Sequence, residues 1–259
     1  MHETTLRLPD RSSKPRTTGV TMMIDGGLPT GQFIDVVESH TDLVDVVKFG
    51  WGTSLVTKDL QRKIDAVRAN GVDFYFGGTL FEKFLVQDRV DDWRRFVDSF
   101  GATTIEISNG TIDLSNQDKA EFVARFAGDY LVYSEVGLKD SAKAADMGAD
   151  LWLHDIREDL AAGAVKVITE ARESGTSGIA SANGELRTDI LGEILGSDID
   201  VDSLMFEAPN KSLQVYLIAQ VGSNVNLGNI APADLVPLET LRLGLRGDTL
   251  KIMEELTHA

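Results

Sequence analysis

Eight short apolar segments of this chain each end in a polar residue or a glycine at a regular spacing. The residues at these ends lie 23, 29, 29, 29, 35, 37 and 19 positions apart, and in order they are Asp25, Lys48, Gly77, Glu106, Glu135, Glu170, Glu207 and Asn226. The spacing averages near one strand plus one helix, so these side chains are expected to converge on one rim. Carboxylates and a lysine gathered there could hold a divalent cation and an anionic ligand.

The four glutamates in this series predict a metal site. Four carboxylates on one rim would repel one another unless a cation lay among them. Carboxylate oxygens are the hard ligands that Mg²⁺ prefers. We therefore predict a Mg²⁺ site with ligands from Glu106, Glu135, Glu170 and Glu207. The alternative for any one of them is a salt bridge to a neighbouring lysine or arginine. A zinc site is not expected, because the four histidines lie away from the strand ends.

Basic residues also lie at, or just after, the ends of the apolar segments. Lys48 lies near the end of the run Val46–Phe49, so it is expected to be partly buried and to need a carboxylate or an anionic ligand. Lys139, Arg172 and Lys211 come just after the fifth, sixth and seventh segments. Arginine offers a planar fork for phosphate or sulfonate oxygens, whereas lysine can donate a proton. Lys48 and Lys139 are the candidate catalytic residues, and Lys211 is expected to be a surface cation at the start of a helix.

Glycine-rich segments near the same rim could bind an anion through backbone N–H groups. Turns need glycine as well, so each segment alone is a weak signal. The candidate substrate-binding residues are Arg172, Gly77, Gly78, Asn226, Gly228 and Asn229.

The elements that must position these residues alternate along the chain. The apolar segments predict strands over 19–25, 44–49, 72–76, 103–107, 130–135, 165–170, 203–207 and 224–227. Helical periodicity lies between them, over 31–39, 57–69, 115–126, 151–162, 187–195, 210–220 and 235–245. Eight such units in about 250 residues predict an α/β fold, a single-domain (β/α)8 TIM barrel over 19–259. The polar segment 1–18 is expected to be a flexible arm. A doubly wound sheet is the rival fold, but the first strand is not followed by a Gly-x-Gly-x-x-Gly motif.

Composition limits the function classes. The 259 residues carry 25 Lys+Arg against 41 Asp+Glu, a formal net charge of −16, which argues against nucleic-acid binding. Cysteine is absent, so disulfides and thiolate chemistry are excluded. No apolar run is long enough to cross a bilayer, and the first 18 residues do not form a secretory signal. We expect a cytoplasmic protein without membrane partners, and a homo-oligomer is compatible with the sequence. The acidity fits a solvated surface, a salty environment or a basic partner.

Longer motifs carry a family resemblance. In the first half they are Lys48-Phe-Gly-Trp-Gly-Thr-Ser54, Gly77-Gly-Thr-Leu-Phe-Glu82, Glu106-Ile-Ser-Asn-Gly-Thr111 and Ser134-Glu-Val-Gly137. In the second half they are Glu170-Ala-Arg-Glu-Ser-Gly175, Phe206-Glu-Ala-Pro209, Asn224-Val-Asn-Leu-Gly-Asn-Ile230 and Leu241-Arg-Leu-Gly-Leu-Arg-Gly-Asp248. Through these motifs the chain resembles the phosphosulfolactate synthase family from about Lys14 to Asp248.

The resemblance implies a barrel that adds sulfite to phosphoenolpyruvate and gives (2R)-phospho-3-sulfolactate with the help of Mg²⁺. In methanogens this reaction is the first step toward coenzyme M, and bacterial relatives serve sulfolactate production. Sulfite attacks the methylene carbon, and negative charge builds on the carboxylate as an aci-carboxylate. Mg²⁺ on the rim glutamates would stabilise that charge. A lysine then protonates C2 from one face.

The resemblance also assigns roles to residues. It points to Lys139 as the proton donor, although this chain has Leu138-Lys139 where relatives carry two adjacent lysines. If the proton donor of the relatives corresponds to position 138, either the side chain of Lys139 must extend to the same place or Lys48 must donate the proton instead. Arg172, with backbone donors from Gly228 and Asn229, is expected to bind the phosphate or the sulfonate.

Two other functions fit the same residues. One is a barrel lyase or aldolase that forms a Schiff base through Lys48 or Lys139. The other is a non-catalytic barrel protein associated with stress, since a plant heat-stress protein also resembles this family and a fold alone does not fix a function.

Overall fold

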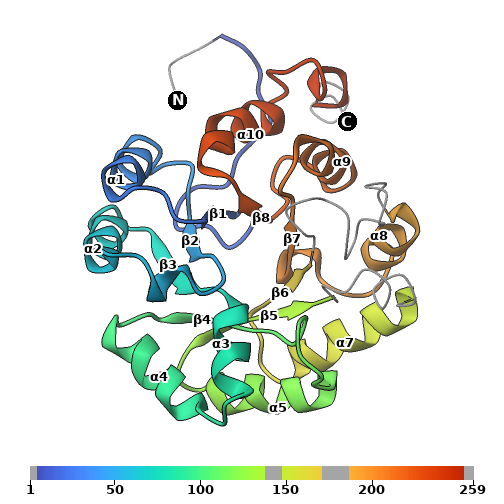
Figure 1. Ribbon diagram of the computed structural model, residues 1–259. Helices are drawn as coiled ribbons and strands as arrows, with labels where there is room; N and C mark the ends of the chain where they lie inside the picture. The colour runs from blue at the N-terminus through green and yellow to red at the C-terminus, as the bar shows by residue number, and fades with distance from the viewer. Residues whose placement is uncertain (1–4, 138–147, 171–186, 254–259) are drawn as a thin grey trace.

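Eight parallel strands form the centre of the computed structural model, which describes residues 5–137, 148–170 and 187–253 (Figure 1). The strands are β1 (Thr21–Asp25), β2 (Val46–Phe49), β3 (Asp73–Phe76), β4 (Thr104–Ile107), β5 (Leu131–Val136), β6 (Lys166–Thr169), β7 (Leu204–Glu207) and β8 (Leu227–Ile230). Their hydrogen-bonded order is β3-β2-β1-β8-β7-β6-β5-β4. The predicted single-domain (β/α)8 barrel is confirmed, and the first seven predicted strands agree with the structure to within two residues.

Helices follow the strands and surround them as an outer ring (Figure 1). They are α1 (Thr30–Ser39), α2 (Leu60–Ala69), α3 (Gly78–Leu85), α4 (Val90–Ser99), α5 (Asn116–Phe126), α7 (Ala149–Ala161), α8 (Thr188–Leu195), α9 (Lys211–Val221) and α10 (Leu235–Arg242). Side-chain caps begin two of them: Ser115 accepts from the N–H of Asp118 before α5, and Asn210 accepts from that of Leu213 before α9. In the part of the chain that the structure describes, no helix has the length and apolar character of a membrane span.

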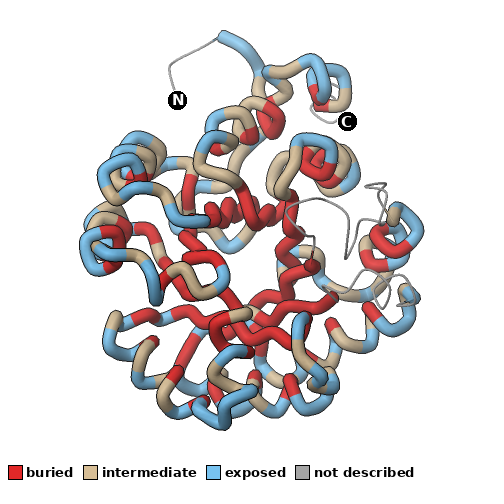
Figure 2. Tube along the Cα trace, viewed as in Figure 1, coloured by how far each residue is buried: buried red, intermediate tan, exposed pale blue. Residues whose placement is uncertain are grey.

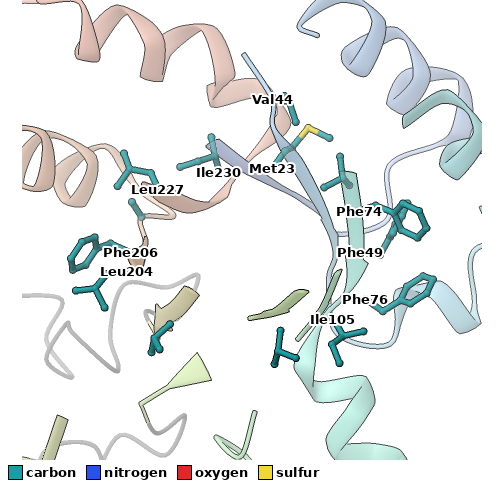
Figure 3. Packing of buried hydrophobic residues seen from close by; sticks show 14 of the residues in the cluster. Met23, Val44, Phe49, Phe74, Phe76, Ile105, Leu204, Phe206, Leu227 and Ile230 are labelled. Atoms are coloured by element: carbon teal, nitrogen blue, oxygen red, sulfur yellow. The ribbon is translucent and has the colours of Figure 1, made fainter. Parts of the chain in front are cut away.

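The strands divide the apolar core into two layers, because alternate side chains of a strand point to opposite faces. Outward-facing residues such as Phe49, Phe74 and Phe206 pack against the helices in the larger layer (Figure 3). Inside the barrel lies a smaller cluster made of Val20, Met22, Val46, Tyr75, Ile168 and Met205. The strands are buried over almost their whole length, and the helices are exposed on their outer sides (Figure 2).

The barrel has a seam between β3 and β4, two fully described strands that are neighbours in space but lie at the two ends of the hydrogen-bonded order. Side chains bridge this seam at both ends. At the amino end, Asp73 accepts hydrogen bonds from the hydroxyls of Thr103 and Thr104. At the carboxyl end, the N–H of Gly78 donates to Oε1 of Glu106 at 2.5 Å. Glu106 therefore helps to close the barrel.

The last strand lies three residues later than predicted. Thr21 pairs with Leu227 but Met23 pairs with Ile230, so β8 contains a bulge opposite β1. The bulge includes Asn229, whose φ of 53° lies in the left-handed region that asparagine tolerates better than most residues. Gly228-Asn229 is a pair typical of turns, and here it extends a strand instead.

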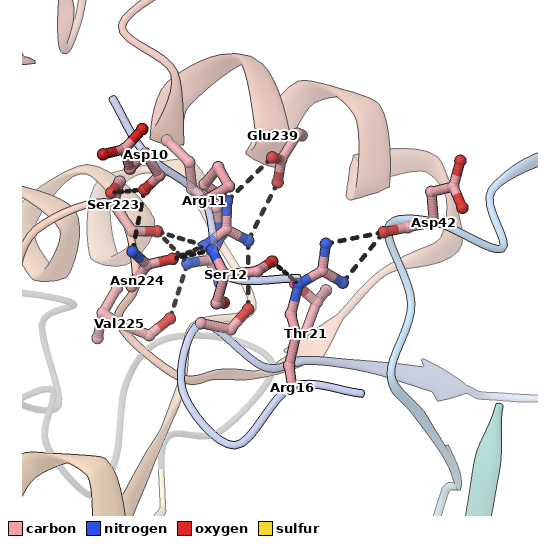
Figure 4. Close-up of polar contacts among 12 residues, drawn as sticks. Asp10, Arg11, Ser12, Arg16, Thr21, Asp42, Ser223, Asn224, Val225 and Glu239 are labelled. Carbon is pink, nitrogen blue, oxygen red and sulfur yellow. Dashed lines mark hydrogen bonds and ion pairs between the residues drawn. The ribbon is translucent and has the colours of Figure 1, made fainter. Parts of the chain in front are cut away.

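The segment predicted as a flexible arm makes specific contacts along its described part (Figure 4). Arg11 donates to Oδ1 of Asn224 at 2.6 Å and forms an ion pair with Glu239 at 3.0 Å. Arg16 forms an ion pair with Asp45 at 3.0 Å. Asp45 and Asn224 precede β2 and β8, so these contacts attach the arm to the amino end of the barrel and to α10.

Candidate active site

Lys48 lies among carboxylates at the carboxyl end of the barrel, on the inward face of β2. Its side chain is 7% exposed, and its Nζ is 3.0 Å from Oε2 of Glu106, 3.3 Å from Oε1 of Glu207 and 3.6 Å from Oε2 of Glu135. Burial opposes the charge on Lys48, but the carboxylates, Glu106 and Glu207 foremost, raise its pKa well above the usual 10.5. Lys48 is therefore protonated at neutral pH and offsets part of the negative charge of the glutamates.

Gly77 and Gly78 allow the close packing around Lys48. A Cβ on Gly77 would lie 3.3 Å from Cε of Lys48, and one on Gly78 would lie 2.3 Å from Oγ of Ser108 and 2.8 Å from Oε1 of Glu106. The N–H of Gly78 also belongs to the first turn of α3, where the helix dipole favours a carboxylate. Glu106 is therefore held by α3 through one oxygen and by Lys48 through the other.

Glu135, Glu170 and Glu207 form a compact group of oxygens on the same rim. One carboxylate oxygen from each lies within 4.8 Å of the others, and all three residues are buried. Three buried carboxylates at this separation fit the hard, oxygen-only donor set of Mg²⁺. The structure thus gathers three of the four predicted ligands. Lys48 pairs with Glu135 and Glu207 as well as with Glu106, but only Glu106 also accepts the N–H of Gly78, and it does not belong to this group of oxygens.

Asn226 does not reach this rim, so its prediction as a substrate-binding residue at a strand end is wrong. Its Oδ1 accepts from the N–H of Val20 at 3.0 Å, and its Nδ2 donates to the carbonyl of Leu204 at 2.9 Å. The physical reason is the late start of β8 at Leu227, which leaves Asn226 at the amino end of the strands. There its amide links the starts of β1 and β7.

The other predicted residues fall into three groups. Gly228 and Asn229 lie in the bulge of β8, and Oδ1 of Asn229 is buried without a hydrogen-bond partner among the described residues. Lys139 and Arg172 lie outside the residues that the structure describes. Lys211 starts α9 and pairs with Asp248 at 2.9 Å with its side chain half exposed, so the surface role predicted for it is confirmed.

Two buried polar residues of the site were missed in the sequence. Glu82, in α3, accepts from Oγ of Ser108 at 2.5 Å and from the N–H of Thr111 at 3.2 Å, so it fixes the loop after β4. A signal existed, because Glu82 and Thr111 each end a conspicuous motif. Tyr75 is the neighbour of Lys48 across β2 and β3. Burial, with Glu106 nearby, raises the pKa of its hydroxyl well above 10, so Tyr75 stays neutral.

Comparisons with known proteins identify the family of the chain. The family model for (2R)-phospho-3-sulfolactate synthase (ComA) matches residues 9–248. The phosphosulfolactate synthase of Bacillus subtilis (strain 168) is 51% identical over 249 residues, which cover 96% of this chain and 99% of that protein. The phosphosulfolactate synthase of Methanothermobacter thermautotrophicus is 42% identical over 246 residues, which cover 93% of this chain and 95% of that protein.

Solved structures support the fold alone. The 3-hexulose-6-phosphate synthase from Salmonella typhimurium superposes with a TM-score of 0.52 at 14% identity, and the match covers 92% of this chain and 97% of that chain. Because the family model and both relatives span nearly the whole chain, the chain belongs to the phosphosulfolactate synthase family of enzymes.

Proposed function

We propose that this enzyme adds sulfite to phosphoenolpyruvate and produces (2R)-phospho-3-sulfolactate. The observation that carries the proposal is the carboxyl end of the barrel, where a charged lysine lies beside three clustered carboxylates. The sulfur lone pair forms a bond to the methylene carbon C3, and the electrons of the C2–C3 double bond move toward the carboxylate. A proton then adds to C2, so all atoms of sulfite and phosphoenolpyruvate remain in the product.

Glu135, Glu170 and Glu207 are the residues proposed to hold Mg²⁺. When bound there, the ion would supply positive charge close to the substrate carboxylate, where negative charge develops. Lys48 contributes a second positive charge that is fixed in place by Glu106 and does not depend on a metal. Preorganised charges of this kind stabilise a developing oxyanion without reorganisation of the site.

Lys48 is better suited to this electrostatic role than to proton transfer or to Schiff-base formation. Its carboxylate neighbours raise its pKa well above 10.5, so it retains its proton at neutral pH and is a poor nucleophile. We therefore propose Lys139 as the donor of the proton to C2. Arg172 and the bulge residues Gly228 and Asn229 are proposed to bind the phosphate. The bulge lies within β8, and barrels of this type often bind phosphate in the loops after the last two strands.

Product analysis tests the proposal. The protein is incubated with phosphoenolpyruvate, sulfite and Mg²⁺, and the expected product is phosphosulfolactate, detected by mass spectrometry. Absence of that product over a range of salt and metal concentrations would refute the proposed reaction. Lys139→Ala is expected to abolish turnover and to leave phosphoenolpyruvate binding nearly unchanged, and full turnover in this variant would assign the proton to another group. Borohydride trapping with a keto substrate is expected to give no covalent adduct, and an adduct would favour the Schiff-base alternative.

A further inference from the structure

Behind the end of β5 lies a fully buried ion pair that the proposed reaction does not use. Nζ of Lys119, in α5, is 2.7 Å from Oδ2 of Asp159, in α7, and both side chains are 0% exposed. The same Asp159 oxygen accepts from Oγ of Ser134 at 2.6 Å. Lys119 also donates to the backbone carbonyl of Glu135 at 2.7 Å. The pair therefore connects two outer helices to the strand residue that carries a proposed metal ligand.

The contact with Glu135 occurs where β4 no longer pairs with β5, although β6 pairs with β5 as far as Val136. The last ladder pair between β4 and β5 joins Ile107 to Ser134, one residue before Glu135. At Glu135, one residue further along, the Lys119 ammonium donates to the backbone carbonyl in place of β4. The side chain of Glu135 points into the barrel while its carbonyl is fixed from outside, so the Lys119 contact limits how far this carboxylate can shift.

The helix α7, which carries Asp159, also packs close to Glu170, the residue that follows β6. Gly137 has a φ of 127°, and a Cβ at this position would lie 2.7 Å from Cβ of Glu170 and 2.8 Å from the ring of Trp152. Trp152 belongs to α7, as does Asp159, and is buried. The helix that carries Asp159 thus packs directly beneath the turn that lies against Glu170.

We infer that Lys119, paired with Asp159, is a positioning residue that sets the place of Glu135 relative to Glu170 and Glu207. The inference rests on the proposed metal site. Stability alone is a weak reason for such a pair, because a buried ion pair is costly to desolvate and well-packed apolar residues are often as stable. Partners that orient metal ligands are commonly worth 10- to 100-fold in metal affinity.

A second buried ion pair, between Lys63 and Asp25, serves as a matched control. This pair has an Nζ–Oδ2 distance of 2.6 Å, both side chains are also 0% exposed, and it lies between α2 and the end of β1. Its aspartate accepts backbone N–H groups of the β1–α1 loop at Gly27 and Leu28. It resembles the first pair in chemistry and burial, but its contacts are with this loop and not with a proposed metal ligand.

The experiment compares two double variants, Lys119→Met/Asp159→Asn and Lys63→Met/Asp25→Asn, with the unmodified protein. Both variants remove one buried ion pair and keep an amide oxygen for the remaining donors. Binding of Mn²⁺ without substrate is measured by calorimetry and by the Mn²⁺ paramagnetic resonance spectrum, and the free energy of unfolding is measured in urea. Metal affinity then reports on the glutamates separately from stability and from turnover.

The expected result is a Kd for Mn²⁺ that is about 10- to 100-fold higher in the Lys119 double variant. In the Lys63 double variant we expect a change of less than about threefold, even where the two variants unfold equally easily. Equal effects of the two variants, or no effect of the Lys119 variant, would overturn the inference and leave the metal site intact. Failure of the unmodified protein to bind Mn²⁺ would refute the proposed metal site and with it the inference.

Discussion

Replacement of Lys48 by methionine tests the charge balance of the site. Methionine keeps most of the apolar stem and removes the ammonium that lies 3.0, 3.3 and 3.6 Å from three carboxylates. Each of these glutamates has a side chain that is 1% exposed, so water cannot replace the lost cation. Removal of one partner of a buried ion pair costs about 3–5 kcal/mol. A chain of this size loses roughly 2–4 °C in Tm per kcal/mol, so we expect Tm to fall by about 6–20 °C.

The assay follows unfolding in urea and product formation, with Lys166→Met as the control. Lys166 is also a buried lysine, but it lies at the amino end of the barrel and donates to the carbonyls of Thr17 and Asp202 at 2.9 and 2.7 Å. Lys48→Met is expected to lower turnover about 100-fold or more, as is typical when a preorganised electrostatic group is lost. Lys166→Met is expected to keep the turnover of its folded fraction. A Lys48→Met protein within about 1 kcal/mol of the parent and with full turnover would refute the argument.

The pH dependence of this difference has a defined sign. The pKa of Lys48 in the folded protein lies well above its ordinary value of 10.5, so folding binds its proton more tightly. The stability that Lys48 contributes is therefore fully present below about pH 10 and is lost as the pH rises through the folded-state pKa. The difference in unfolding free energy between the parent and Lys48→Met is expected to be constant from about pH 7 to pH 9.

Three further predictions concern Gly78, Tyr75 and Arg11, with Gly192 as the comparison for Gly78. Gly78→Ala is expected to cost about 1–3 kcal/mol in urea unfolding, because its Cβ would meet Ser108 at 2.3 Å. Gly192→Ala, at an open position in α8, is expected to stabilise by about 0.4–1 kcal/mol, and equal effects of the two would contradict the steric argument. Tyr75→Phe is expected to raise the unfolding free energy by about 1 kcal/mol, since the buried hydroxyl has no hydrogen-bond partner among the described residues, and a loss of stability would reveal one. Arg11→Ala is expected to cost about 2–3 kcal/mol without changing the turnover of folded protein, and unchanged stability would mean that the arm is not held.

The sequence predicted the architecture well because hydrophobic periodicity is a local property. Buried parallel strands are short, mostly apolar runs such as residues 44–49, and they stand out against the amphipathic helices. The convergence of Lys48 with Glu106, Glu135 and Glu207 followed from the barrel topology once the strand ends were placed. What periodicity does not give is the exact end of a strand that contains a bulge. Gly228-Asn229 is typical of a turn, so β8 was placed too early and Asn226 was assigned to the wrong end of the barrel.

Buried ion pairs were the second feature that could not be predicted from the sequence. Lys63 and Lys119 lie on helices where lysine usually faces solvent, and only their aspartate partners, 38 and 40 residues away in sequence, make burial tolerable. Such pairings depend on how the helices pack against the sheet, and a local sequence pattern does not predict that packing. The arm shows the same limit, because its polar composition is typical of a free tail whereas its arginines have defined partners.

The contacts of Arg11 also bear on how the chain reaches its native state. Its partners Ser223, Asn224 and Glu239 follow it by 212, 213 and 228 residues, and β1 pairs with β8 across a similar separation. A ribosome that adds about 5–20 residues per second needs roughly 10–45 s to make the chain between Arg11 and Glu239. During that time the first strand has one open edge and Arg11 lacks its partners, although Arg16 can already pair with Asp45. Closure of the ring is therefore a late step of biosynthesis, and contacts of such high sequence separation favour slow folding.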